Sequence, residues 1–341
     1  MMLPEWILVF VATAAITALL VALARALAIR IGAFDRPVEG THKVHGTPTP
    51  LLGGVAVALG TASGALVADA MGESVPSGVL ISGAVALLVG PVDDLRRDGL
   101  SPAPKLLGQI AASTLAVTML GTPGWLGFPP VDAVLVVVAL VLITNAFNLI
   151  DNVNGLCAGT GALAALALVA WSAFVDTSTA VALPLAAACL AFLPFNFPRA
   201  RLFLGDAGSH AIGHLIGVLA LLSLSPACPG VHTISVLLVT GLPFADVAWV
   251  VAIRTREGRS ILIGDRTHLS HTLLQIGRSL PQAVGALWGV AGLLATLSVL
   301  AIASGRFGIA ALLGGVGGAA TLGWLRRLAY LRALERSQGD A

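Results

Sequence analysis

Long apolar runs separated by short polar segments dominate this sequence. A helix that crosses a bilayer needs roughly 20 mostly apolar residues, and about eleven runs approach that length. Several of the runs are rich in Gly and Ala, which suits close packing between helices. We predict membrane-spanning helices over residues 5–29, 51–70, 78–94, 104–121, 131–149, 156–175, 178–195, 209–225, 232–253, 283–303 and 307–325.

The composition supports a membrane protein. The chain has 341 residues, of which 57% are hydrophobic and 11% charged, and its mean hydropathy is +0.94. A soluble domain carries roughly 25% charged residues. Because no long polar linker divides the chain, we expect an all-α polytopic membrane protein with one integral membrane domain over residues 1–341. The first run lacks a basic start and exceeds the apolar region of a signal peptide, so it is predicted to be a retained span.

The distribution of positive charge predicts the orientation. With the spans above, all of the 19 lysines and arginines except Arg306 fall on one side or at the end of a span near it. Cytoplasmic loops carry the excess of Lys and Arg. We therefore expect the N-terminus outside, the C-terminus in the cytoplasm and a location in the plasma membrane. The unusual polar segments all lie on the predicted cytoplasmic side.

The first two of these segments combine carboxylates with cations. Residues 35–54 form a proline-rich basic loop, in which Lys43 and two histidines are suited to phosphate; an ordinary positive loop is the alternative. Residues 90–109 hold the adjacent acids Asp93 and Asp94, followed by Lys105. Adjacent carboxylates repel each other, and a divalent cation offsets that repulsion. The alternative is a surface ion pair between Asp94 and a nearby arginine.

The third segment places amides and an acid where an apolar run ends. Asn145, Asn148 and Asp151 are spaced at i, i+3 and i+6, so they share roughly one face if the helix continues. Such groups are costly in hydrocarbon unless they are paired, ligand-bound or near water. Asn154 precedes Gly155, which is a natural helix stop. The alternative is that these asparagines only cap the helix.

The fourth and fifth segments add an acid and a pair of histidines. Asp206 precedes an apolar run, where it suits either an ordinary helix cap or a Mg²⁺ ligand. His210 and His214 follow it at metal-binding spacing, but packing is the favoured interpretation. In residues 254–277, His268 and His271 have basic surroundings, so phosphate contact is favoured over zinc ligation; a plain basic loop is the alternative.

Together, these segments predict phosphoryl transfer at one face of the membrane. Carboxylates and amides hold Mg²⁺, whereas Arg, Lys and His hold phosphates, which suits a soluble anionic donor and an acceptor anchored in the bilayer. An ion-coupled transporter is the alternative from another class. Transporter sites lie near the bilayer midplane, but the predicted span interiors are mostly uncharged apart from Asp246. A non-catalytic scaffold is a third interpretation.

The five segments, in this order, resemble the polyprenyl-phosphate N-acetylhexosamine-1-phosphate transferase superfamily, glycosyltransferase family 4. The resemblance covers roughly residues 35–280. The stretch that ends in Asp-Arg-Thr-His-Leu-Ser-His is more similar to the bacterial GlcNAc-1-phosphate branch than to phospho-MurNAc-pentapeptide transferase. The resemblance implies transfer of a sugar-1-phosphate from a UDP-amino sugar to undecaprenyl or decaprenyl phosphate, with release of UMP. UDP-MurNAc-pentapeptide or another UDP-sugar is the alternative donor.

The resemblance also implies roles for particular residues. It implies Mg²⁺, with Mn²⁺ as the alternative, held by Asp206 and Asn148. The candidate catalytic residues are Asp93, Asp94, Asp151, His268 and His271. The candidate substrate-binding residues are Lys43, Asn145, Asn154, Lys105 and Arg266. Asp93 is the candidate to activate or position the lipid phosphate. We expect no nucleic-acid partner, and a homodimer is considered.

Two positions depart from the family's pattern. The family often reads Asp-Gly-x-Asp-Gly where this chain has Asp151-Asn152-Val153-Asn154-Gly155, so Asn154 replaces an acid. Ser270 replaces a histidine that is common in His-x-His-His. A phosphate acceptor is largely ionised at neutral pH, since its second pKa is about 6. We therefore expect positioning and charge neutralisation to matter more than a strong base.

Overall fold

The structure is a computed structural model that describes residues 3–35, 48–94, 101–124, 126–175, 178–222, 229–260 and 267–339. These residues are almost entirely helical. The one small sheet pairs β1 (Phe34–Asp35) antiparallel with β2 (Thr49–Pro50). The helices are α1 (Leu3–Ile31), α2 (Gly53–Ala70), α3 (Ser77–Asp94), α4 (Pro102–Leu120), α5 (Pro129–Ile150), α6 (Leu156–Trp171), α7 (Thr179–Asn196), α8 (Gly205–Leu222), α9 (Pro229–Val239), α10 (Gly241–Arg256), α11 (Leu269–Gln275), α12 (Leu280–Ser304) and α13 (Phe307–Gly339).

The helices confirm the predicted class of an all-α polytopic membrane protein. Within the described ranges, 6 helices are long and apolar enough to cross a membrane, or up to 7 if one bent pair counts as a span. The six are α1, α2, α5, α7, α12 and α13. Each predicted apolar run coincides with a helix or, in one case, with two helices. The count of eleven spans and their orientation stay predictions.

The run predicted as one helix over residues 232–253 is broken into α9 and α10. The two helices meet at an angle of 70°. Pro243 lies four residues after Val239, where α9 ends. A proline ring clashes with the carbonyl four residues earlier and has no N–H to donate to it. The apolar pattern continues through this break, so it predicted a single span.

Three helix ends differ from the prediction by four residues or more. α6 ends at Trp171 instead of 175, and α8 begins at Gly205 instead of 209. α13 continues to Gly339 rather than ending at 325. The extension contains Arg, Leu, Ala and Glu, which are good helix formers although the segment is no longer apolar. Hydropathy therefore predicts where an apolar surface ends, which is not always where the helix ends.

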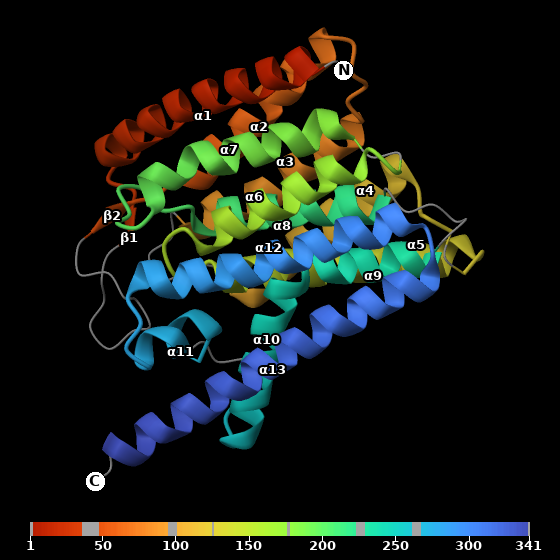
Figure 1. Cartoon of the computed structure of the whole chain (residues 1–341). Coiled ribbons are helices and arrows are strands. Elements are labelled where there is room, and N and C mark those ends of the chain that lie inside the picture. Colours follow the sequence, from red (N-terminus) through yellow and green to blue (C-terminus); the bar gives the residue numbers. More distant parts are fainter. Residues whose placement is uncertain are drawn as a thin grey trace.

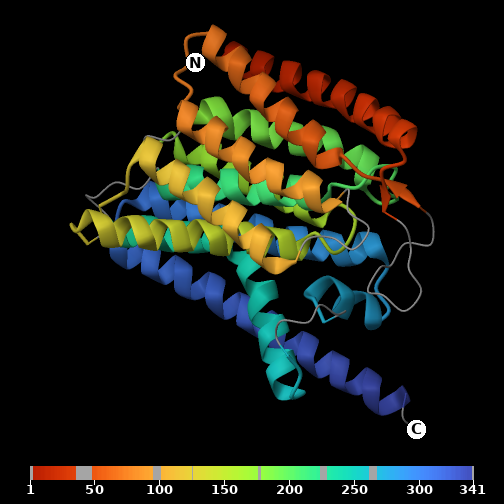
Figure 2. The same cartoon turned by 180° about the vertical axis from the view of Figure 1, so that it is seen from behind.

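α8 is the most enclosed helix of the bundle. Every side chain from Ala207 to Leu221 is buried. α3 and α5 pack along α8, and α6 packs on α7 and α12. α1 and α13 lie at opposite edges of the bundle, whereas α10 runs across the direction of its neighbours (Figure 1). Figure 2 shows the same arrangement from behind.

Two glycines allow the backbones of α3 and α2 to lie directly against the backbone of the first turn of α8. A Cβ on Gly90 of α3 would lie 1.9 Å from the nitrogen of Ala207. A Cβ on Gly54 of α2 would lie 2.0 Å from the nitrogen of Gly208. Neither backbone neighbour can rotate away as a flexible side chain can. Small residues at such contacts are typical of close helix packing in membranes, and here they fix the position of the first turn of α8.

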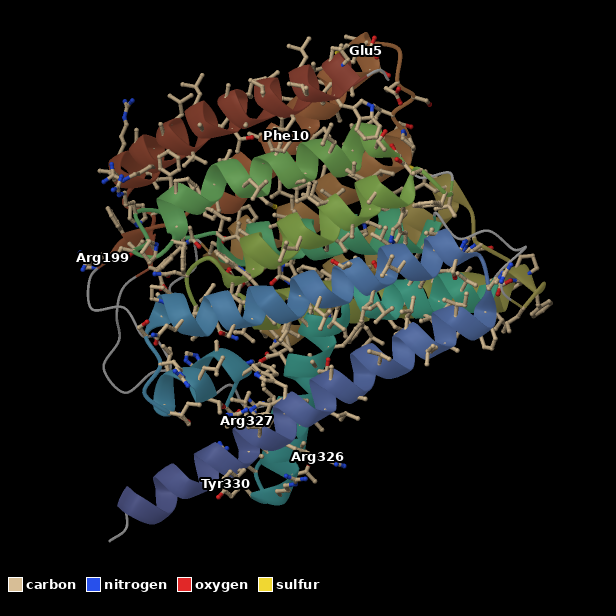
Figure 3. The ribbon with its side chains drawn as sticks, in the orientation of Figure 1. Glu5, Phe10, Arg199, Arg326, Arg327 and Tyr330 are labelled. Carbon is tan, nitrogen blue, oxygen red and sulfur yellow. The ribbon has the colours of Figure 1, made fainter. Side chains whose placement is uncertain are left out.

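The polar segments gather at one end of the bundle, which we call the polar end. It comprises the ends of α3, α5 and α7, the starts of α4 and α8, and the small sheet. Backbone hydrogen bonds join these parts, from Gly53 to Phe203 at 3.0 Å, from Gly54 to Leu204 at 2.8 Å and from Phe203 to Pro50 at 2.9 Å. Figure 3 shows Arg199 near this end and Glu5 near the opposite end.

Candidate active site

Asp206 lies at the centre of a cluster at the polar end. It belongs to the first turn of α8, and its two carboxylate oxygens have different partners. Lys105, in the first turn of α4, donates to Oδ2 at 2.6 Å. Asn148, in the last turn of α5, donates to Oδ1 at 3.1 Å and to the hydroxyl of Ser209 at 3.0 Å. The cluster therefore joins three helices through a carboxylate, an amide and an ammonium group.

Asp94 caps the first turn of α8 from the neighbouring helix α3. Its carboxylate accepts from the backbone nitrogen of Asp206 at 3.0 Å and from that of Ala207 at 3.3 Å. A negative charge at a helix N-terminus is stabilised by the unpaired N–H groups and the helix dipole. Gly205 completes this contact, because its φ is +71° and a Cβ there would lie 2.6 Å from Oδ2 of Asp94. Asp94 thus holds the backbone that carries Asp206.

Asp151 is half-buried directly after α5, close to the same carboxylates. Burial raises the pKa of Asp151 well above its ordinary value, and the negative charges of Asp206 and Asp94 raise it further. Like charges disfavour ionisation in this way. The three acids therefore form an anionic site in which a cation would be stabilised.

Asn145 lies one turn before Asn148 and is engaged inside the protein. Its amide and that of Gln109 on α4 donate to each other, the latter at 3.3 Å. Asn145 also donates to the carbonyl of Val141 at 2.8 Å, and Gln109 lies 3.0 Å from His210 on α8. This network ties α4, α5 and α8 together below the Asp206 cluster. The structure thus places Asn145 in a helix-joining network, and its substrate-binding role stays a prediction.

The loop after α5 contacts two other segments at the polar end. Asn152 donates to the carbonyl of Leu149 at 2.7 Å and accepts a hydrogen bond from the hydroxyl of Ser270. Asn154 donates to the carbonyl of Pro198 at 3.2 Å. A carboxylate at position 154 has no N–H for that bond. Both departures from the family's pattern, Asn154 and Ser270, therefore make contacts that depend on the side chains present here.

The two predicted histidines lie at the start of α11. His268 precedes the helix and His271 lies in it, with a distance of 6.2 Å between the ring centroids. Nδ1 of His268 lies 2.6 Å from a carboxylate oxygen of Asp246 on α10. The contact between Ser270 and Asn152 places α11 against the loop that carries Asp151. The structure thereby links the histidines to the acidic cluster through that loop.

Three predicted site residues fall wholly or partly outside the described residues. Lys43 and Arg266 lie outside the described residues, and so does the side chain of Asp93 at the end of α3. Their predicted roles rest on the sequence. Of the other predicted residues, the structure brings Asp94, Lys105, Asn148, Asp151 and Asp206 together in one cluster.

Several polar residues of this region were part of the predicted segments but were not singled out by the sequence analysis. Gln109 lies four residues after Lys105, so helical spacing was a usable signal for it. Ser209 follows Asp206 by three residues in the same way. Asn196, at the end of α7, accepts from the nitrogen of Gly155 at 2.6 Å and donates to the carbonyl of Leu202 at 3.0 Å. No local pattern marks the bond between Asn196 and Gly155, because these residues are 41 positions apart.

The acidic cluster fits a divalent cation that completes its coordination with substrate. Within the part of the chain that the structure describes, no three His, Cys, Asp or Glu side chains form a group that could hold a metal. Mg²⁺ usually takes one or two carboxylates together with waters and substrate phosphates. Asp206 offers a carboxylate, the Asn148 side chain offers an amide oxygen, and the excess negative charge around Asp151 suits a cation.

The raised pKa of Asp151, caused first by burial and then by the charges of Asp206 and Asp94, leads to a testable prediction about stability. An acid whose pKa is raised on folding stabilises the folded state at low pH, and this contribution is lost as the pH rises from about 4 through the raised pKa. Asp151→Asn cannot ionise, so without divalent metal it should melt at a higher temperature than the wild type at pH 8 and show a smaller difference at pH 5. Thermal unfolding in detergent measures this. Asp69 is exposed at the end of α2 that lies away from the polar end. The matched change Asp69→Asn should therefore show no such pH dependence. Equal shifts of the melting temperature in both variants would contradict the prediction.

Comparison with known proteins identifies the class to which this fold and site belong. The model of glycosyl transferase family 4 matches residues 77–224, which include the Asp206 cluster. Relatives resemble the chain over most of its length, and the chain belongs to this family.

The relatives carry closely related names. Decaprenyl-phosphate N-acetylglucosaminephosphotransferase of Mycolicibacterium smegmatis is 35% identical over 324 residues, covering 82% of this chain and 78% of that protein. The probable undecaprenyl-phosphate N-acetylglucosaminyl 1-phosphate transferase of Bacillus subtilis is 30% identical, covering 74% and 73%. Undecaprenyl-phosphate alpha-N-acetylglucosaminyl 1-phosphate transferase of Salmonella typhi is 29% identical, covering 84% and 81%.

Proposed function

We propose that this protein transfers N-acetylglucosamine-1-phosphate from UDP-GlcNAc to a polyprenyl phosphate, such as undecaprenyl or decaprenyl phosphate. The products are polyprenyl-diphosphate-GlcNAc and UMP, and the reaction is a first membrane step of cell-envelope glycan synthesis. The observation that carries this proposal is the cluster of Asp206, Asn148 and Lys105 at the polar end of a membrane bundle. Membership of the family and the names of its relatives support the sugar and the lipid.

The proposed reaction needs charge neutralisation more than a base. An oxygen of the lipid phosphate bonds to the β-phosphorus of the donor, and the bond from that phosphorus to the bridging oxygen breaks as UMP leaves with the electron pair. Mg²⁺, or Mn²⁺, bound at Asp206 and Asn148 would neutralise charge on the diphosphate. Lys105, which contacts Asp206, would hold a phosphate beside it. Fixed donors of this kind stabilise charge that develops in the transition state.

The other predicted residues have supporting roles in this proposal. Asp94 positions the first turn of α8. Asp151 lies beside the other two acids, where a bound cation would stabilise its charged form. His268 and His271 neutralise the donor diphosphate from α11, together with Lys43 and Arg266. Asp93 positions the lipid phosphate. UDP-MurNAc-pentapeptide or another UDP-sugar is the alternative donor.

We also propose the topology predicted from the charges. Eleven spans, with α9 and α10 as one broken span, place the N-terminus outside and the C-terminus in the cytoplasm. The alternating direction of successive helices supports this topology, because α3, α5 and α7 end at the polar end, whereas α4 and α8 begin there. The site then faces the cytoplasm, where nucleotide sugars are present, and the protein lies in the plasma membrane.

An apolar pocket beside the broken span supports a lipid acceptor. It lies between α5, α8, α9 and α10, and its lining includes Ala139, Ile143, Val236 and Phe244. Leu142, also in the lining, is 54% exposed, so the pocket opens to the bilayer side. Isoprene units are apolar, and burying them against such a surface is favourable by about 25 cal/mol per Å² of apolar area removed from water. The pocket is our proposed site for part of the polyprenyl chain.

Filling the pocket tests that assignment. Ala139→Phe should raise KM for polyprenyl phosphate by about tenfold, which is about 1.4 kcal/mol of lost lipid binding, with little change in KM for UDP-GlcNAc. Ala320→Phe, at an exposed position on α13, is the matched control and should leave both constants unchanged. Equal values of KM for the lipid in the two variants would remove the pocket from the proposal.

The activity itself is tested with the purified chain in detergent. Undecaprenyl phosphate, Mg²⁺ and a panel of UDP-amino sugars should give a lipid-linked product and UMP, with UDP-GlcNAc as the preferred donor. Omission of divalent metal should stop turnover. Absence of transfer from every donor in the panel would contradict the proposed function, and preference for UDP-MurNAc-pentapeptide would establish the alternative.

A further inference from the structure

Asp246 is a buried acid that the proposed reaction does not use. It lies in the apolar part of α10 and is 3% exposed. Both of its carboxylate oxygens are engaged at the start of α11. Oδ2 lies 2.6 Å from Nδ1 of His268, and Oδ1 accepts from the backbone nitrogen of Leu269 at 2.7 Å.

An acid in this place is costly without a partner. A charged side chain inside a membrane bundle is costly to bury and is usually paired, and such residues often mark functional positions. Here the partner is a histidine that the family resemblance assigns to phosphate contact. A ring nitrogen bonded to a carboxylate carries the proton, which fixes both the tautomer and the orientation of the ring.

We propose that Asp246 is a positioning residue that presents Nε2 of His268 to the substrate phosphates. This inference rests on the proposed function, because it assigns a role to His268 in that reaction. Asp246 accepts the proton of Nδ1, so Nε2, on the opposite side of the ring, is the nitrogen that meets substrate. A phosphate oxygen accepts from Nε2–H in the imidazolium form, in which both ring nitrogens are donors. The bond from Leu269 fixes the carboxylate plane at the same time. Asp246 acts on the reaction through His268 and touches neither substrate.

A purely structural role for Asp246 makes a different prediction. The carboxylate joins α10 to α11 through Leu269, so in a purely structural role its loss weakens the attachment of α11 without any effect on the protons of the His268 ring. A second bond joins the same two helices, from Nε1 of Trp249 to the hydroxyl of Thr272 at 3.3 Å. That bond does not involve His268, so it provides a matched control for attachment alone.

The test is a double-mutant cycle of Asp246→Asn and His268→Ala in the transfer assay. To keep the bond with Leu269, the amide introduced by Asp246→Asn would present its NH₂ group to Nδ1. Nδ1 accepts that bond only without a proton, so the ring is neutral and loses the positive charge that faces the phosphates. We expect kcat to fall about 10- to 100-fold, as for other partners that orient a histidine, with KM for UDP-GlcNAc changed less than about threefold. In the His268→Ala background, Asp246→Asn should cause no further loss. Residues that act through one another show such non-additivity.

The control is the pair Trp249→Phe and Thr272→Val, which removes both partners of the second bond and keeps their bulk. It should retain kcat within about threefold, since replacing both partners by apolar groups is nearly neutral. If Asp246→Asn unfolds in detergent, Asp246→Glu keeps the charge and should retain more activity than His268→Ala does.

Each outcome bears on the inference. An equal loss from Asp246→Asn in both backgrounds, or an equal loss in the control pair, shows attachment only and overturns the inference while the proposed function stands. A fully active Asp246→Asn or an Asp246→Glu no better than His268→Ala also overturns it. No transfer by the wild-type chain contradicts the proposed function and the inference with it.

Discussion

Replacing Asp206 with alanine is expected to lower kcat for sugar-phosphate transfer by at least about 10³-fold, or about 4 kcal/mol in the barrier. Asp206 is the carboxylate around which Lys105 and Asn148 are arranged. Its loss removes the central proposed ligand for the divalent cation. It also leaves the lysine and the amide without the group that orients them. Both effects reduce charge neutralisation on the diphosphate.

The measurement is single-turnover transfer at saturating donor and lipid, repeated over a range of Mg²⁺ concentration. Asp206→Asn keeps the shape and loses the charge, so it should be nearly as inactive as Asp206→Ala. Asp69→Ala removes an exposed acid at the opposite end of the bundle and should be fully active. Activity of Asp206→Asn within tenfold of the wild type would remove Asp206 as the central metal ligand.

A second large effect is expected where α3 meets α8. Gly90→Ala places a methyl group 1.9 Å from the nitrogen of Ala207 unless the helices separate. Overpacking costs typically about 1–3 kcal/mol. The separation also moves Asp94 away from the turn that it caps and shifts Asp206 beside it. A misplacement of about 1 Å can cost about 10²-fold in rate, so we expect both lower thermal stability and a loss of that size in kcat.

Gly289→Ala is the matched control for this prediction. Gly289 is also helical, but a Cβ there meets no atom within 4 Å. Alanine is favoured over glycine in helices by up to about 1 kcal/mol, so this variant should be as stable as the wild type or more so, with full activity. Thermal unfolding and transfer rate, measured side by side, should show losses of stability and rate in Gly90→Ala and neither loss in Gly289→Ala. A Gly90→Ala protein as stable and active as Gly289→Ala would contradict the close contact.

The sequence predicted the helices well because apolar length and helix formation coincide in a bilayer. The predicted run 51–70 and α2 (Gly53–Ala70) differ by only two residues at one end. The prediction failed where the apolar run and the helix do not begin or end at the same residues. Pro243 breaks the helix without reducing hydropathy, and the last part of α13 continues as a helix after hydropathy falls.

The residues of the candidate site were also predictable, but their partners were not. Asp206, Asn148 and Lys105 stood out as polar groups at the ends of apolar runs, and the fold brings them together. The cap that Asp94 provides for α8 joins residues that are 112 positions apart. The bond between Asp246 and His268 crosses from one helix to another. Such pairings depend on how the helices pack, and no spacing in one sequence contains that information.

The central claim is that the sugar and its phosphate move together. It is tested most directly with UDP-GlcNAc labelled with ³²P in the β-phosphate, incubated with the purified chain, Mg²⁺ and undecaprenyl phosphate. The proposed reaction places the label in the lipid product and leaves unlabelled UMP. Label recovered in UDP, with unlabelled sugar on the lipid, would show transfer of the sugar alone and contradict the account.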